Sequence, residues 1–248
     1  ASVQTQSRIA IIDAVTLPKN ALEKIAAYPV RIVISPTFQF LDIATHYLGR
    51  VMPISGSFRG ETYIDVNEDY AFVTSTSRPG HNSNLESIVL GICITAGKSS
   101  TGFQLAELML ELPSVMEIRL ISSGRPPQSL RAQDHFIHCS ETLDPWSFFS
   151  NCNRFIGGDG LMVSEAVAMH KPTFSLVTDL TNPKNLGLIS KGAILPFTWG
   201  DVESGTLSRY LTDQGLIRGL GQACELAFSE ERAEQLASSI LALAQNYD

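Results

Sequence analysis

The residues best suited to binding chemistry lie in the stretch FIGGDGLMVSEAVAMHKPTFSLVT, residues 155–178. An apolar run comes first, then a short turn, a short helix and another apolar run, which predicts a strand, turn, helix and strand. The turn consists of Gly157, Gly158, Asp159 and Gly160. The N–H groups at the start of such a helix favour negative charge, so a phosphate is one predicted occupant. A turn that only joins the strand to the helix is the other interpretation.

A second turn of similar type precedes this stretch. An apolar strand is predicted over residues 87–97, and the following helix is predicted to begin near Phe103. The turn between them contains Gly97, Lys98, Ser99, Ser100, Thr101 and Gly102. It is not a Walker loop, because the order G-x-x-x-x-G-K-[ST] is missing. Its amides, hydroxyls and lysine could hold a diphosphate, or its serines could be ordinary turn and capping residues.

Composition restricts the classes of function. The chain of 248 residues is 44% hydrophobic, which is ample for a packed core. A net charge of −7 and a pI near 5.2 argue against a nucleic-acid partner, because no basic block could neutralise phosphates. The apolar stretches are far shorter than the roughly 20 residues of a membrane span. The opening residues ASVQTQSR lack a signal-peptide core, so a cytoplasmic location is expected.

Neither the cysteines nor the histidines predict a metal site. The four cysteines, Cys93, Cys139, Cys152 and Cys224, are scattered without C-x-x-C spacing. Reduced, partly buried thiols are the simplest interpretation. His135 and His138 are three residues apart, but they flank a predicted strand and lack further ligands.

The first part of the chain predicts a parallel sheet. Buried strands are expected over residues 8–14 and 30–35, with a helix between them. Asp13 lies at the carboxyl end of its strand, where α/β proteins bind ligands, although a helix cap is the other role open to it. Residues 36–85 are less regular, and residues 75–84 are predicted to link two lobes.

The second part of the chain alternates strands and helices more clearly. Further strands are predicted over residues 116–124, 136–141 and 193–197. A helix is expected to start at Pro145, and another is expected to stop at Gly192. After Gly200 the chain is predicted to form two helices, the second over residues 229–245.

Residues 86–200 resemble the C-terminal, nucleotide-sugar-binding lobe of the GT-B glycosyltransferase superfamily. The resemblance rests on ITAGKSSTG, on FIGGDGLMVSEAVAMHKPTFSLV and on TNPKNLGLISKGA. Within the superfamily, the chain is most similar to the branch that holds the UDP-sugar hydrolase of pseudaminic acid synthesis and the peptidoglycan N-acetylglucosaminyltransferase. The stretch DYAFVTSTSR is similar to the hydrolase pattern at the crossover between the lobes.

The resemblance implies a role for each matching residue. Glu165 matches the acidic residue that binds the ribose hydroxyls, and Gly157 and Gly158 match the turn that faces the diphosphate. The remaining matches are Ser99 and Ser100 in the opposite loop and Asn182 and Asn185 near the sugar. The nucleobase is expected near residues 136–141. A UDP-sugar is the implied ligand.

The implied reaction is displacement at the anomeric carbon, with the nucleoside diphosphate as leaving group. Helix N-termini and Lys98 or Lys184 are expected to stabilise the charge that develops on the leaving diphosphate. The reaction is therefore expected to need neither a metal ion nor a cofactor, and activity should survive a chelator.

The first lobe departs from the family pattern. Both named relatives carry a glycine-rich loop with a histidine after their first strand, whereas this chain begins with RIAIIDAV and has no such loop there. An enzyme with an unrecognised base, such as Asp13 or His81, is one interpretation. A sugar-nucleotide-binding protein, or one subunit whose first lobe is completed by a partner subunit or by a second copy in a homodimer, is another. An unrelated doubly wound α/β protein is the third.

The predicted fold class is therefore α/β and GT-B-like, with two Rossmann-like lobes, parallel sheets and a reduced N-terminal lobe. Residues 1–84 are assigned to the reduced lobe and residues 85–248 to the nucleotide-sugar-binding lobe. His170 also replaces the glycine that usually precedes the proline of the central stretch.

Overall fold

The chain divides into two compact units, one formed by Ala1–Tyr70 with Glu230–Asp248 and the other by Ala71–Ser229. The computed structural model describes residues 9–12, 17–34, 43–49, 62–65, 87–94, 99–139, 145–158, 160–181, 185–227, 238 and 240–242. The predicted boundary between residues 84 and 85 lies outside these ranges, so it stays a prediction.

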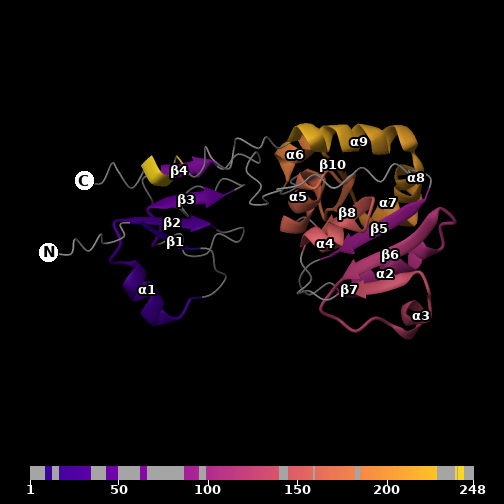
Figure 1. Cartoon of the computed structure of the whole chain (residues 1–248), viewed down its shortest axis with the longest axis horizontal. Coiled ribbons are helices and arrows are strands. Elements are labelled where there is room, and N and C mark those ends of the chain that lie inside the picture. Colours follow the sequence, from indigo (N-terminus) through magenta and orange to yellow (C-terminus); the bar gives the residue numbers. More distant parts are fainter. Residues whose placement is uncertain are drawn as a thin grey trace. The chain divides into compact units, whose positions relative to one another are not determined.

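The first unit contains a four-stranded parallel sheet in the order β1-β2-β3-β4 (Figure 1). Its strands are β1 (Ile9–Ile12), β2 (Val30–Ile34), β3 (His46–Gly49) and β4 (Thr62–Asp65). Helix α1 (Lys19–Ile25) joins β1 to β2 and begins directly after Pro18, whose fixed φ suits a helix start. Ile12 and Val33 form the core of this unit together with Ala44.

Two strands of the first unit were not predicted. Strands β1 and β2 confirm the predicted apolar runs, but β3 and β4 lie in the region that was predicted to be irregular. Neither of these short strands carries a continuous apolar run. His46 in β3 is nevertheless 2% exposed, and its Nδ1 lies 2.9 Å from Oγ1 of Thr45.

The second unit contains a six-stranded parallel sheet in the order β10-β9-β8-β5-β6-β7. Its strands are β5 (Ile88–Cys93), β6 (Val115–Ile121), β7 (Phe136–Cys139), β8 (Arg154–Gly158), β9 (Thr173–Leu176) and β10 (Ile194–Phe197). Its helices are α2 (Ser99–Leu110), α3 (Gln128–Arg131), α4 (Pro145–Ser150), α5 (Leu161–Ala168), α6 (Leu186–Ser190), α7 (Trp199–Glu203), α8 (Thr206–Thr212) and α9 (Gln214–Ala227).

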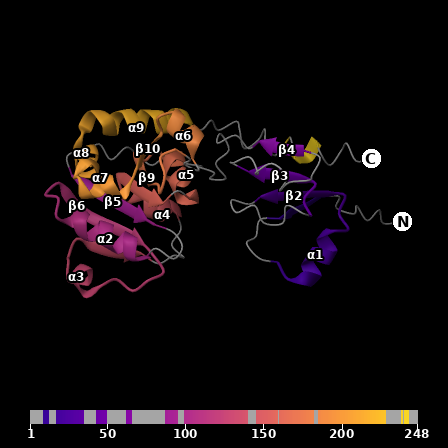
Figure 2. The same cartoon turned by 180° about the vertical axis from the view of Figure 1, so that it is seen from behind.

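Helices cover both faces of the six-stranded sheet (Figures 1 and 2). On one face, Leu90 and Ile92 pack in an apolar cluster with residues of α2 and α8. On the other face, Phe155 packs with Phe148 of α4 and Val163 of α5. A sheet that is buried on both faces needs nearly continuous apolar strands, which is why the strands of this unit could be predicted from their composition.

The end of the second unit contains more helices than predicted. Helices α7, α8 and α9 occupy the region up to Ala227, where one helix was expected before residue 229. Gly205, with φ of 71°, separates α7 from α8. Asp213 separates α8 from α9, because its Oδ1 accepts hydrogen bonds from the N–H groups of Gly215 and Leu216. Most of the predicted helix over residues 229–245 lies outside the described residues.

Candidate functional site

The strand order of the second unit reverses between β5 and β8. The chain moves outward from β5 through β6 and β7, returns to β8 on the other side of β5, and moves outward again through β9 and β10. At the carboxyl ends of the two central strands, Cys93 lies opposite Gly157. Open α/β sheets bind ligands at this edge, because the connections after the two central strands lead to opposite faces there. The two turns singled out in the sequence follow these two strands.

The turn after β8 leads into α5 at this edge. Gly160 precedes the helix in an extended conformation, with φ of −135°, and its N–H donates to the carbonyl oxygen of Gly158 at 2.7 Å. Gly160 has no side chain that could cap α5, and the first turn of α5 contains no acidic residue. The N–H groups of this turn are therefore suited to an anion.

Gly157 has a packing role in addition to its predicted place in the turn. The residue is buried, and a Cβ at this position would lie 2.5 Å from Cγ2 of Val163 and 2.8 Å from Cε1 of Phe155. Real Cβ atoms do not approach carbon atoms so closely, so α5 packs against β8 only because residue 157 has no side chain.

Helix α2 begins at Ser99 and not near Phe103 as predicted. Ser99 and Ser100 are thus the first two residues of the helix, and Ser100 is exposed. Gly102 lies inside the helix, where a Cβ would come within 3.3 Å of Cδ1 of Leu120. Glycine is unfavourable inside a helix, so residue 102 was predicted to lie in the turn. Close packing of α2 on β6 accounts for glycine at this position.

Glu165 and Asn185 lie on neighbouring helices. Glu165 is half-buried in the second turn of α5. Asn185 directly precedes α6 and is 4% exposed. Its Oδ1 accepts a hydrogen bond from Oγ of Ser164, the residue next to Glu165, at 3.3 Å. The side-chain oxygen of Asn185 is thus used within the protein, and its predicted contact with a sugar stays a prediction.

The remaining predicted site residues lie outside the described residues: Asp13, His81, Gly97, Lys98, Asp159 and Asn182. The structure leaves their predicted roles untested. The same applies to Lys184 and to the side chain of Ser99.

Two side chains at the carboxyl ends of β6 and β7 form a contact that was not predicted from the sequence. Oγ of Ser122, which directly follows β6, lies 3.1 Å from Nε2 of His138 in β7. The ring of Phe103 in α2 lies beside the ring of His138, with 6.4 Å between their centroids. These residues are far apart in the sequence, so no local pattern could have indicated the contact. His138 lies within residues 136–141, where the nucleobase was expected.

His170 ends α5 in a left-handed conformation, with φ of 55°. The N–H of His170 donates to the carbonyl oxygen of Val167, and the N–H of Lys171 donates to that of Ala166. This pair of hydrogen bonds defines a Schellman motif, whose left-handed residue is usually glycine. Gly192 takes the same place after α6, with φ of 72°, as predicted. The glycine expected at position 170 is therefore a helix-ending residue.

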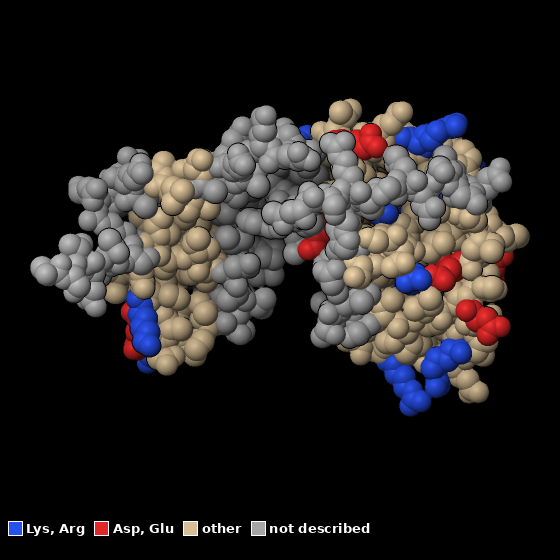
Figure 3. Space-filling view, in the orientation of Figure 1, with Lys and Arg blue, Asp and Glu red and all other residues tan. Residues whose placement is uncertain are grey.

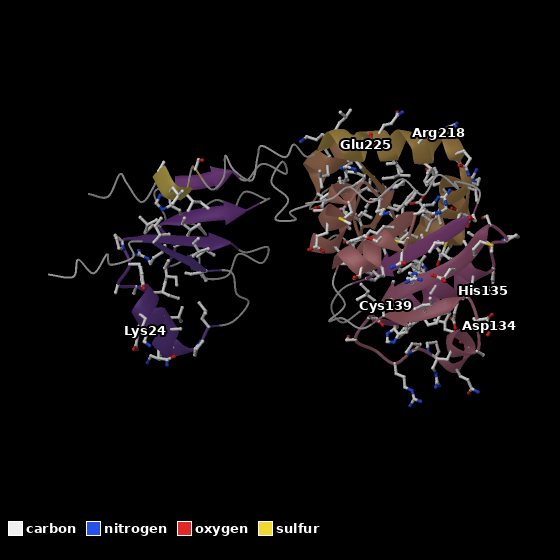
Figure 4. The ribbon with its side chains drawn as sticks, in the orientation of Figure 1. Lys24, Asp134, His135, Cys139, Arg218 and Glu225 are labelled. Carbon is white, nitrogen blue, oxygen red and sulfur yellow. The ribbon has the colours of Figure 1, made fainter. Side chains whose placement is uncertain are left out.

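All four cysteines are buried and none forms a disulfide, as the interpretation as reduced thiols predicts. Burial raises the pKa of Cys152 to about 12. Burial also raises the pKa of Cys224 and that of Cys139, which is labelled on β7 in Figure 4. Thiolates are the reactive form of cysteine, so these three groups are poor nucleophiles in the folded protein.

We therefore expect the native protein to resist thiol reagents. At pH 8, Cys139, Cys152 and Cys224 should not react with dithionitrobenzoate over minutes, and all four cysteines should react in 6 M guanidinium. Because the pKa of Cys152 rises from 9.0 in the free thiol to about 12 in the fold, the unfolded chain loses this proton first. The contribution of the Cys152 thiol to the free energy of unfolding should therefore decrease as the pH rises from about 9 to 12. Rapid native labelling of Cys152 would contradict this expectation.

The described residues contain neither a metal cluster nor a membrane span. No group of three or more His, Cys, Asp and Glu side chains in the described part of the chain could hold a metal ion. Within the same ranges, no helix has the length and apolar character needed to cross a bilayer. On the face shown in Figure 3, lysine and arginine side chains alternate with acidic ones over the coloured surface.

An open groove of about 740 Å³ lies between α2, α3 and α7. Its lining includes Glu107 of α2, Glu111 directly after α2, and Trp199 and Glu203 of α7. None of the predicted site residues lines this groove. It is separate from the edge where β5 and β8 end.

Solved structures resemble this chain, although no family model and no curated protein matches it. A structure of MnaA from S. aureus with UDP has a TM-score of 0.59 and 12% identity, and the match covers 85% of this chain and 68% of MnaA. The spinosyn rhamnosyltransferase SpnG has a TM-score of 0.55 and 14% identity, with 84% of this chain and 70% of SpnG covered.

A third similar structure is that of a putative UDP-N-acetylglucosamine 2-epimerase from Listeria monocytogenes. Its TM-score is 0.55 at 12% identity, and the match covers 88% of this chain and 69% of that protein. At such low sequence identities, the similarity concerns the fold alone. It covers most of this chain and about two thirds of each similar protein.

Proposed function

Because the chain has the GT-B fold, we propose that it binds a nucleoside diphosphate sugar at the carboxyl edge of its six-stranded sheet and transfers or hydrolyses the sugar. We propose uridine as the nucleoside, since one of the similar structures holds UDP. The resemblance of residues 86–200 to the nucleotide-sugar-binding lobe supports the same ligand.

The observation that supports the proposal most strongly is the adjacency of β5 and β8. Two turns with the composition of anion-binding loops were found independently in the sequence, and the strands that precede them are neighbours at the reversal of strand order. The helices that follow, α2 and α5, both start at this edge, and neither has an acidic residue in its first turn. Two helix N-termini favour a group with two negative charges, such as a diphosphate.

In the proposed reaction, the bond between the anomeric carbon and the diphosphate oxygen breaks, and the leaving nucleoside diphosphate keeps the electron pair. A new bond forms from the anomeric carbon to the oxygen of water or of an acceptor hydroxyl, whose proton passes to a base. The N-termini of α2 and α5 stabilise the leaving group. Glu165 accepts hydrogen bonds from the ribose, and Asp13 and His81 are the candidate bases.

UDP and UDP-N-acetylglucosamine are expected to raise the melting temperature of the full chain by several degrees. A ligand at 100 times its Kd stabilises the fold by about 2.7 kcal/mol, and each kcal/mol shifts the melting temperature of a chain of this size by about 2–4 °C. A thermal-shift series with UDP, UDP-N-acetylglucosamine, uridine and inorganic phosphate measures this. Uridine and phosphate are expected to have far smaller effects, because neither bridges the ribose and diphosphate positions.

Product analysis then separates binding from catalysis. Incubation with UDP-N-acetylglucosamine should release UDP, and added EDTA should leave the rate unchanged, because helix N-termini and lysines are proposed to stabilise the leaving group. A melting temperature that no UDP ligand shifts would contradict the proposal as a whole. Release of UDP that EDTA abolishes and a divalent ion restores would contradict its metal-free chemistry.

The sequence of the first unit favours a second candidate function. The stretch RIAIIDAV is not followed by a glycine-rich loop with a histidine, so the group that activates the attacking oxygen is not evident. The chain would then bind a sugar nucleotide without turning it over, or supply one subunit of a split glycosyltransferase. UDP-dependent stabilisation without release of UDP would favour this candidate, and light scattering would establish whether a homodimer completes the site.

A further inference from the structure

The groove between α2, α3 and α7 concentrates negative charge. Carboxylates of Glu107, Glu111 and Glu203 line it, and the described residues of its wall include neither lysine nor arginine. Glu107 is half-buried, whereas Glu111 and Glu203 are exposed. Within the part of the chain that the structure describes, none of the three forms an ion pair. Oε1 of Glu107 accepts a hydrogen bond from the hydroxyl of Ser129, which leaves its negative charge in place.

These three carboxylates lie where negative charge is unfavourable to the fold. Glu107 is in the last turn of α2, Glu111 directly follows that helix, and Glu203 is the last residue of α7. The carbonyl groups at the end of a helix carry partial negative charge, which repels a carboxylate. Neither helix has a basic residue in its last turn to offset this repulsion. A cation bound in the groove would offset it.

The shape and lining of the groove favour an extended organic cation over a metal ion. In the described residues, no group of three or more His, Cys, Asp and Glu side chains could hold a metal ion, so these carboxylates do not form a metal site. The groove has a volume of about 740 Å³ and is open to solvent, which suits a chain of several linked groups.

The groove also has an apolar part. Leu108 of α2 is 39% exposed there, and Trp199 of α7 is half-buried and packs against the core. Trp199 is the first residue of α7, whose start is fixed by a capping box between Thr198 and Asp201. An indole ring near carboxylates suits a guanidinium group, which stacks on the ring and donates to the carboxylate oxygens. Arginine next to an apolar side chain therefore matches this lining.

We propose that the groove is the docking site for a segment of a partner protein that carries arginine residues next to leucine or another apolar residue. The guanidinium groups of the segment pair with Glu107, Glu111 and Glu203, and its apolar side chain packs against Leu108. None of the residues proposed to bind the nucleotide sugar lines this groove. The partner is therefore separate from the substrate, and the inference does not rest on the proposed function.

A hexapeptide of alternating arginine and leucine, acetylated and amidated at its ends, is the probe. Titration calorimetry with the full chain should detect binding, and the dissociation constant should rise at least about fivefold from 50 to 300 mM sodium chloride, because salt screens exposed ion pairs. The same peptide with glutamine in place of arginine should bind at least about tenfold more weakly, because it has no charge to pair with the carboxylates.

The double variant Glu111→Gln/Glu203→Gln should weaken binding of the arginine peptide about five- to tenfold, because two ion pairs at the surface are lost. Glu23→Gln/Glu225→Gln is the matched control. Glu23 on α1 and Glu225 on α9 are also exposed, neither lines the groove, and the change in net charge is the same. The control should weaken binding less than twofold, which separates pairing in the groove from general attraction to an acidic protein.

The melting temperature without peptide tests the argument from the helix ends. Glu111→Gln/Glu203→Gln should raise it by about 1–3 °C, because negative charge is removed from the C-termini of α2 and α7. Weaker peptide binding by this variant would then not be a result of unfolding. A lower melting temperature would mean that these carboxylates stabilise the fold themselves, and would overturn the inference.

The remaining outcomes also decide the proposal. A chain that does not bind the arginine peptide, or that binds the glutamine peptide equally well, would overturn it. Equal weakening by the two double variants would place the peptide outside the groove. Spermine that binds as tightly as the peptide, and that is weakened in the same way by Glu111→Gln/Glu203→Gln, would identify a free polyamine as the occupant and exclude a protein segment.

Discussion

Replacing Glu165 with alanine is expected to weaken UDP binding by about 10- to 100-fold. The carboxylate is proposed to accept both ribose hydroxyls, and a hydrogen bond to a charged group contributes about 1.5–3 kcal/mol, with 1.4 kcal/mol equal to tenfold. The half-buried setting of Glu165 places the expected loss in the lower part of that range. Calorimetry with UDP measures the loss directly.

Removal of a ribose hydroxyl from the ligand tests the same proposed contact between Glu165 and the ribose. The unchanged chain should bind UDP more tightly than 2′-deoxyuridine diphosphate, and Glu165→Ala should bind the two alike, because the hydroxyl no longer has its acceptor. Glu225→Ala serves as the control variant. Glu225 is exposed and lies on α9, where it is labelled in Figure 4. A preference for UDP that survives in Glu165→Ala would exclude the ribose contact.

The variant Gly157→Ala is expected to destabilise the chain by about 1–3 kcal/mol. The new Cβ meets Val163 at 2.5 Å and Phe155 at 2.8 Å, and both of these side chains are fully buried. Valine is branched at Cβ and cannot turn aside within a helix, so α5 has to move away from β8. Urea unfolding followed by circular dichroism gives the change in the free energy of unfolding.

Gly219→Ala is the control for the effect of the methyl group itself. Gly219 lies exposed within α9, and a Cβ there would meet no atom within 4 Å. Alanine favours a helix over glycine, so this variant should stabilise the chain by up to about 1 kcal/mol. The same substitution thus has opposite signs at the two positions. An unchanged midpoint for Gly157→Ala would mean that α5 adjusts to the methyl group without cost.

Continuous apolar runs explain which parts of the fold could be predicted from the sequence. Strands β5 and β8 are buried on both faces, so their composition identifies them without knowledge of their neighbours. Strands β3 and β4 lack such runs, and their pairing is visible only in the sheet. The start of α2 was placed too late because Gly102 resembles a turn residue. Its place inside the helix depends on contact with Leu120 of β6.

The candidate site was predictable only in part for a similar reason. The glycine turn and Glu165 are close together in the sequence, so a single local pattern identifies them. The adjacency of β5 and β8 depends on topology, which no local pattern contains. Ser164 and Asn185 are 21 positions apart, and nothing in the intervening residues marks their contact. The resemblance to the nucleotide-sugar-binding lobe implied a contact between Asn185 and the sugar, which stays a prediction.

The left-handed turn at His170 affects how sequences of this kind can be recognised. The motif that ends α5 requires a positive φ at this position. The only requirement on the side chain is that the residue can adopt such a φ. Glycine meets that requirement most easily, and histidine and asparagine are among the residues that also meet it. A search pattern that insists on glycine before the proline would therefore pass over chains whose backbone makes the same turn.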